Sequence, residues 1–167
     1  MANEIPGLEF SRLITGLCTL TGFASPQRII AGDGIAYAGV NFSINYKPEK
    51  DRDAILLYAD FGCFDLEKRA MLYPLMLKEN FMMASTCNST FSVSESLDSV
   101  VLIEKVCLST ATPASLLALM RSLSHRVNYF NRQHRHRNAT GTPNHHSPIP
   151  ERASARATFG MQRHASG

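Results

Sequence analysis

The stretch that decides the fold is Asp65–Met83, with the sequence DLEKRAMLYPLMLKENFMM. Four of its apolar residues recur at helical spacing and share one face of a predicted helix: Leu66, Ala70, Tyr73 and Leu77. Four further apolar residues lie outside this stripe: Met71, Leu72, Leu75 and Met76. A helix that is apolar on two faces needs two surfaces to bury against. We expect one to be its own sheet and the other a second copy of the chain. The alternative is a kinked core helix.

Pro74 lies in the middle of this predicted helix. Proline removes one backbone donor and its ring clashes with the preceding turn, at a cost of roughly 3 kcal/mol. We therefore expect a kink or a break at this position.

Upstream of this stretch, the pattern predicts a short arm over 1–9, a helix and then strands. The apolar stripe of that first helix is Phe10, Leu13, Ile14, Leu17 and Leu20. Gly22 stands where a glycine ends a helix, and a loop containing Pro26 follows. From residue 35 the period changes to two, and one face of a half-buried strand is formed by Val40, Phe42, Ile44 and Tyr46. Gly39 indicates a bulge or a tight reversal, and the latter would make 35–38 a separate strand. Residues 54–58 read as a central strand.

Downstream, residues 90–94 and 99–108 read as paired strands joined by a turn. The second is apolar on both faces, which indicates an inner strand or one whose outer face a partner covers. Thr112 and Pro113 then fit the N-cap and first position of a final helix. Its apolar stripe is Leu116, Met120, Leu123, Val127 and Phe130. We expect two regions, a folded domain over 1–133 and a disordered basic His/Arg-rich tail over 134–167.

Composition points to binding rather than to chemistry. The net charge of +3 is uneven, because the tail carries +4 and the first 133 residues about −1. The four cysteines have no metal-ligand or redox spacing, so we expect buried free thiols. No catalytic or cofactor motif occurs, so we expect no enzyme, no cofactor and no metal site. Neither a signal peptide nor an apolar run long enough to span a membrane is present, which predicts a cytoplasmic protein.

The basic tail leaves an alternative function open. His134-Arg-His-Arg137 could contact phosphate groups, which suggests an adaptor for nucleic acid or an anionic surface. The tail lacks interleaved aromatic residues for base stacking, so nucleic acid is the less favoured partner.

Three segments resemble the Tir/CesT-type chaperones of bacterial type III secretion: residues 54–62, 72–81 and 91–105. The second ends in Met76-Leu-Lys-Glu-Asn-Phe81, similar to the Leu-Leu-x-x-Asn-apolar ending of the family's second helix. The resemblance covers about residues 8–132. It implies an α/β (α+β) fold of order α-β-β-β-α-β-β-α, with a twisted antiparallel sheet, in a cytoplasmic bacterial homodimer. It also implies binding to N-terminal segments of one or several secreted effectors, and delivery to the export apparatus and its ATPase.

The resemblance assigns candidate residues only by element. The second helix implies a dimer interface at Leu72, Leu75, Met76 and Glu79. The first helix and the long strand imply effector contacts at Leu13, Leu17, Val40, Phe42 and Ile44. Each of these residues also fits a plain core position. The near-neutral folded part and the long basic tail depart from the small acidic chains typical of the family.

Overall fold

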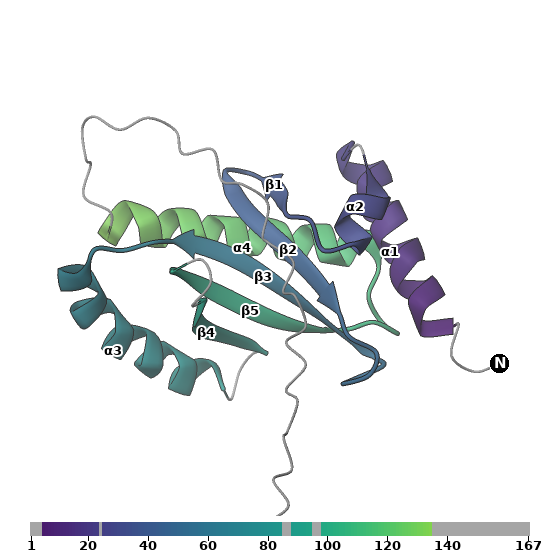
Figure 1. Ribbon diagram of the computed structural model, residues 1–167. Helices are drawn as coiled ribbons and strands as arrows, with labels where there is room; N and C mark the ends of the chain where they lie inside the picture. The colour runs from purple at the N-terminus through teal and green to yellow at the C-terminus, as the bar shows by residue number, and fades with distance from the viewer. Residues whose placement is uncertain (1–4, 24, 85–87, 95–97, 135–167) are drawn as a thin grey trace, which may run out of the picture.

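The computed structural model describes residues 5–23, 25–84, 88–94 and 98–134, and these form one sheet with helices around it (Figure 1). The helices are α1 (Ile5–Thr21), α2 (Pro26–Ile30), α3 (Leu66–Met83) and α4 (Pro113–His134). The strands are β1 (Ile35–Tyr37), β2 (Val40–Tyr46), β3 (Ala54–Gly62), β4 (Ser89–Ser94) and β5 (Ser99–Cys107). They form a five-stranded antiparallel sheet in the order β1-β2-β3-β5-β4. The predicted α/β class and the order of the main elements are confirmed.

The core lies between one face of the sheet and the helices α1 and α4, which Figure 1 shows beside and behind the sheet. Strand register brings Phe42, Ala59 and Leu102 side by side on that inner face, and all three are at most 1% exposed. The strand β5 lies between β3 and β4, as its two apolar faces predicted. Because α1 and α4 take the same face, none of the helices in the described part of the chain covers the opposite face of the sheet.

The first helix is longer than the sequence pattern indicated. α1 begins at Ile5, so residues 5–9, which we expected to form an arm, are helical. The helix ends as predicted at Gly22, which has a φ of +75° and donates its N–H to the Cys18 carbonyl at 2.8 Å. Gly16 meets the start of α4 so closely that a Cβ there would lie 2.5 Å from the Pro113 ring. A glycine is therefore required where the two helices touch.

A tight hairpin joins β1 to β2. Tyr37 pairs with Val40, which leaves Ala38 and Gly39 as the two turn residues, with φ values of +49° and +78°. Positive φ at both central positions is what a type I′ turn needs. The Asn128 side chain of α4 donates to the Ala38 carbonyl at 3.1 Å, which ties the turn to the helix layer. The tight reversal at Gly39 is the alternative that the structure selects.

The start of α4 is as the sequence predicted, whereas the segment around Pro26 is not. Thr112 caps α4, because its hydroxyl accepts the Ser115 N–H at 3.1 Å while the Ser115 hydroxyl accepts the Thr112 N–H at 2.9 Å. The segment around Pro26, which we predicted to be a loop, is instead the short helix α2. Proline suits the first turn of a helix because the N–H that it lacks would have no partner there.

The helix α3 continues through Pro74 as one element of 18 residues, so the break that proline made plausible does not occur. Its start is held by Arg69, which donates to the Phe64 carbonyl at 2.6 Å and forms a two-point ion pair with Asp98 in the turn before β5. This hydrogen-bonded ion pair lowers the pKa of Asp98. The tie fixes α3 relative to the β4–β5 hairpin.

Candidate protein-binding surfaces

The helix α3 lies along the β4 edge of the sheet and turns only a narrow strip inward. Leu72, Met76 and Met83 are the buried residues of this helix, each at most 6% exposed. On an α-helix, positions 72, 76 and 83 fall within one narrow arc. The remaining circumference is left to face solvent or a partner.

Asn80 binds the backbone of the edge strand directly. Its side-chain oxygen accepts the Phe91 N–H at 2.7 Å, and its amide nitrogen donates to the Phe91 carbonyl at 3.1 Å. These are the two groups of Phe91 that a further strand would otherwise pair with. Asn80 therefore closes the middle of the β4 edge and fixes α3 against it. Asn80 belongs to the family-like ending at residues 76–81, but the sequence pattern alone predicts no role for it.

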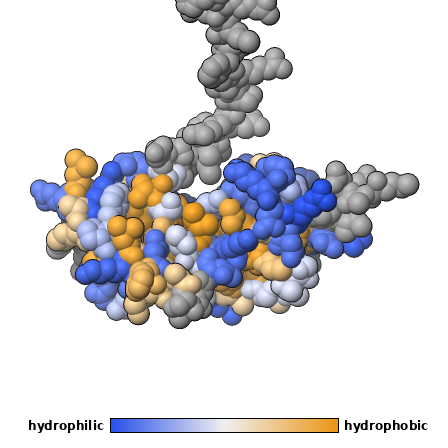
Figure 2. Space-filling model, turned by 90° about the horizontal axis from the view of Figure 1, so that it is seen from below, coloured by the Kyte–Doolittle hydropathy of each residue, from blue (hydrophilic) through white to orange (hydrophobic). Residues whose placement is uncertain are grey.

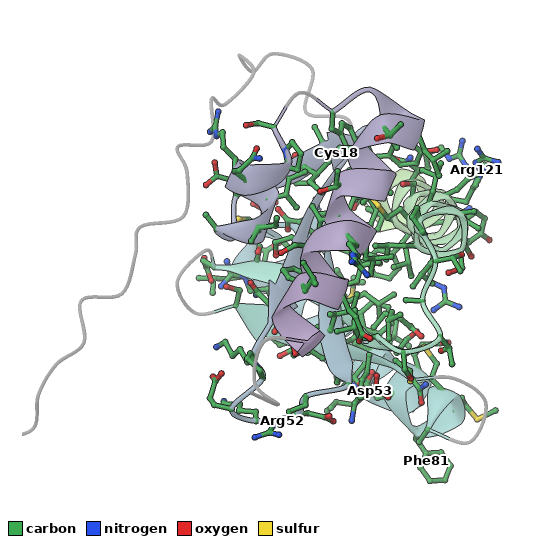
Figure 3. All side chains as sticks on the ribbon, turned by 90° about the vertical axis from the view of Figure 1, so that its right-hand side faces the viewer. Cys18, Arg52, Asp53, Phe81 and Arg121 are labelled. Carbon is green, nitrogen blue, oxygen red and sulfur yellow. The ribbon has the colours of Figure 1, made fainter. Side chains whose placement is uncertain are left out.

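The outward side of α3 carries large apolar side chains. Those more than 45% exposed are Leu66, Met71, Leu75, Leu77, Phe81 and Met82. We call this set the α3 apolar face. A shallow hollow of about 480 Å³ lies at the C-terminal end of α3 and is lined by Leu77, Lys78, Phe81 and Met82. Phe81 is 81% exposed and projects away from the body in Figure 3, and Figure 2 shows hydrophobic patches on the underside of the molecule.

Monomeric proteins rarely expose so many large apolar residues on one helix, and such patches mark interaction sites. The predicted interface set divides between the two sides of α3. Leu75 is 46% exposed and Glu79 is exposed, whereas Leu72 and Met76 are buried at 2% and 5%. Leu72 and Met76 thus take the core position that the sequence also allowed. In the other stripe, Leu66, Ala70 and Leu77 are exposed, and Tyr73 is half-buried against the core.

The five candidate effector-binding residues come together, but inside the protein. Leu13 and Leu17 of α1 and Val40, Phe42 and Ile44 of β2 belong to one core cluster, and none is more than 5% exposed. In this conformation their side chains pack α1 and β2 into the same core and do not reach the surface. Among the described residues of α1 and α2, the exposed large apolar side chains are Leu8, Leu20 and Ile30, at 51%, 55% and 37%.

The outer face of the sheet is a further surface, and it carries both apolar and polar side chains. Register places Tyr58 beside Ile103 and Leu56 beside Lys105 on this face, with Ser43 and Asn45 of β2 next to them. Tyr58, Leu56 and Ile103 are half-buried, and Val101 is 8% exposed. The centre of this face is therefore apolar and its β2 side is polar.

The Asp53 side chain has a structural role. The Asp53 carboxylate accepts from the Cys107 thiol at 2.9 Å, and from the Ser109 N–H and hydroxyl at 2.7 and 3.0 Å. These hydrogen bonds, the thiol first, lower the pKa of Asp53. They tie the start of β3 to the loop before α4. Within the described ranges, no group of three His, Cys, Asp or Glu side chains could hold a metal ion.

The expectation of buried thiols holds for Cys18 alone among the described cysteines. Cys18 is buried, which raises its pKa, but Cys63 and Cys107 are exposed. Cys107 lies on the same face of β5 as Val101 and Ile103, as alternation along a strand requires, and it is exposed at the end of the strand. Cys87 lies outside the described residues, as does the predicted disordered tail beyond His134.

The chain resembles known proteins both in sequence and in structure. Residues 39–129 match the sequence model of the Tir chaperone protein (CesT) family. No curated protein matches the chain in sequence. Among solved structures, the ExsC–ExsE complex matches with a TM-score of 0.61 and 15% identity, over 77% of this chain and 95% of that one. The Yersinia pestis type III secretion chaperone SycH, solved with a stable fragment of YscM2, matches with a TM-score of 0.50 and 11% identity, over 72% and 98%.

The family match spans more than half of the chain, from the β1–β2 turn to the last turns of α4. This protein belongs to the Tir chaperone protein (CesT) family, and its fold is that of a secretion chaperone. Over the part of the chain that the structure describes, no helix is long and apolar enough to cross a membrane.

Proposed function

We propose that this protein is a type III secretion chaperone of the bacterial cytoplasm. It binds N-proximal segments of one or several effectors, keeps them competent for secretion and guides them to the export apparatus and its ATPase. It works by binding and not by catalysis. The observation that carries this proposal is the family match over residues 39–129. The structural likeness to SycH, solved with a fragment of YscM2, supports it at the level of the fold.

Client binding would use exposed apolar side chains on the α1–α2 side of the molecule. Leu8, Leu20 and Ile30 are at least 37% exposed there. An extended segment could place alternate apolar side chains against them without folding itself. Leu13, Leu17, Val40, Phe42 and Ile44 would contribute by packing the elements behind this surface.

The protein would act as a homodimer through the α3 apolar face. Leu75 and Glu79 remain interface candidates because they point outward, and Leu77, Phe81 and Met82 join them on exposure. Two copies that paired these faces would remove large apolar side chains from water, at about 25 cal/mol for each Å² buried. The folded domain would end near residue 133, and residues 134–167 would form a separate basic region.

Co-expression with candidate effectors tests the proposal. We expect a soluble, stoichiometric complex in which about the first hundred residues of an effector co-purify with this chain and resist limited proteolysis only in its presence. Leu20→Asp should weaken this complex about tenfold, because it places a charge on the proposed client surface. Thr19→Asp, at the neighbouring exposed position of α1, is the matched control and should retain binding. Failure of every effector encoded beside the gene to form such a complex would overturn the proposal.

A further inference from the structure

The outward side of α4 carries a row of basic side chains. Arg121, His125 and Arg132 are all exposed and lie within a narrow arc of the helix, opposite the buried Leu116, Met120 and Val127. Arg121 lies on the outer side of α4 in Figure 3, away from the sheet. Tyr129, which is 61% exposed, flanks the row. At 1.5 Å per residue, the three side chains follow one another at about 6 and 10 Å along the axis.

Arg121, His125 and Arg132 form no ion pair with an acidic side chain among the described residues. The ion pairs found there involve Arg28, Lys68, Arg69 and Lys105. The helix itself contains no Asp or Glu in its 22 residues. Most folded proteins intersperse both signs of charge on an exposed helix, so a long helix with Arg and His and no acid is unusual.

The net charge of the chain changes sign along the sequence, shortly before α4. Residues 1–104 contain 8 Lys or Arg and 13 Asp or Glu, a net of −5, whereas residues 105–167 contain 9 and 1, a net of +8. No acidic residue occurs between Glu104 and Glu151. The basic row therefore stands out against an acidic body, which sets the sign of any partner attracted to it.

We propose that the outward face of α4 is a docking surface for an acidic helical segment of a partner protein. A helix of the partner has the same rise as α4, so carboxylates spaced by 4 and 7 residues can face Arg121, His125 and Arg132 in register. Arginine forks bind carboxylates through two parallel hydrogen bonds, which gives such pairs geometric specificity. Ala114 and Ala118 continue the row toward the N-terminus of α4 and are both exposed. Their small side chains allow a second helix to approach closely.

A protein segment fits this surface better than a nucleic acid does. The row on α4 contains only two arginines and one histidine, and the remainder of the folded chain is acidic and repels a long polyanion. A short acidic helix contacts the row without extending over the acidic body. This surface is on a different helix from the α3 apolar face and from the exposed apolar residues of α1 and α2, so the proposal depends neither on the dimer nor on effector binding.

Fluorescence anisotropy with the full chain tests this surface. The probe is a labelled helical peptide with Glu at positions spaced by 4 and 7, and its counterpart has Gln at those positions. We expect the Glu peptide to bind and the Gln peptide to bind at least tenfold more weakly, with affinity falling as salt rises. The double variant Arg121→Glu, Arg132→Glu should weaken binding of the Glu peptide about tenfold or more.

The matched control is Lys47→Glu, Lys50→Glu, which makes the same change in net charge at two exposed loop positions. It should retain binding within about twofold, because the peptide responds to the row and not to total charge. Arg121→Gln, Arg132→Gln gives a second, milder variant whose fold is checked by its thermal melt. Equal losses in the row and control variants would overturn the proposal. So would tighter binding of a single-stranded oligonucleotide of equal charge, which would assign the surface to nucleic acid.

Discussion

The Asn80 amide shows how one side chain can replace a neighbouring strand. It satisfies both the N–H and the carbonyl of Phe91 at the sheet edge, at 2.7 and 3.1 Å. An unpaired edge strand invites pairing with other chains, and proteins commonly cover such edges. Asn80 covers this edge with a helix that stays available for other contacts. The family-like asparagine thus has a structural reason in this chain.

Asn80→Leu should destabilise the protein by about 2 kcal/mol, because two partly buried backbone groups lose their partner. Asn80→Asp should cost less, since a carboxylate still accepts the Phe91 N–H. Chemical denaturation at a fixed protein concentration measures both. Asn45→Leu, on the outer face of β2, is the control for the same change in side chain and should shift stability by less than about 0.5 kcal/mol. An unchanged unfolding midpoint for Asn80→Leu would show that the edge contact is dispensable.

Among the elements, the helix α3 has one buried side and one exposed apolar side. Its inward strip of Leu72, Met76 and Met83 anchors it, and its outward side carries the α3 apolar face. Adjacent residues therefore differ in what they support: Leu75 is 46% exposed and Met76 only 5%. We therefore expect a charge at Leu75 to act on the proposed association, and a charge at Met76 to act on folding.

Leu75→Asp should dissociate the proposed dimer with a small loss of helix content. Met76→Asp should instead lower the free energy of unfolding by about 3 kcal/mol, since it buries a charge without a partner. Sedimentation velocity measures association, and circular dichroism with denaturant measures folding. Leu20→Asp, on the distant helix α1, is the control for association and should stay dimeric. The assignment of the two sides fails if Leu75→Asp unfolds the chain while Met76→Asp leaves it intact.

At the scale of the whole molecule, the three helix surfaces divide the possible contacts. The α3 apolar face suits a second copy, the exposed apolar residues of α1 and α2 suit an extended client, and the basic row of α4 suits an acidic partner. The core that supports all three lies on a single face of the sheet. Separate contacts on one small scaffold would let a chaperone hold a client and a further partner together.

A dimer predicts that thermal stability depends on protein concentration. The melting temperature should rise across a hundredfold increase in concentration, because association stabilises only the folded state. The double variant Leu77→Asp, Phe81→Asp should melt at a lower temperature that does not change with concentration. Both side chains are more than 65% exposed, so their replacement leaves the core intact. A melting temperature of the unaltered chain that is constant over this range would contradict the dimer.

The sequence by itself determined what depends on local pattern. Alternation and helical spacing identified the main strands and helices, and Thr112, Pro113 and Gly22 marked helix ends because caps depend on neighbouring backbone groups. The family motifs placed these elements in a chaperone fold. The pattern did not predict the short helix α2 or the extra turn at the start of α1, because such short segments carry little periodic signal.

Only the tertiary structure decided which side of each element faces inward. The helix α3 is apolar on two sides, so hydrophobicity alone does not show which side is buried. The structure buries the side with Leu72 and Met76 and exposes Leu66 and Leu77. The candidate effector residues shared this ambiguity, since burial in the core and binding to a client demand the same side chains. The partner of Asn80 lies 11 residues away on another element and follows from chain packing alone. Local pattern therefore predicts the elements and their apolar content, whereas the packing of α3 against the β4 edge determines which of its apolar residues are exposed.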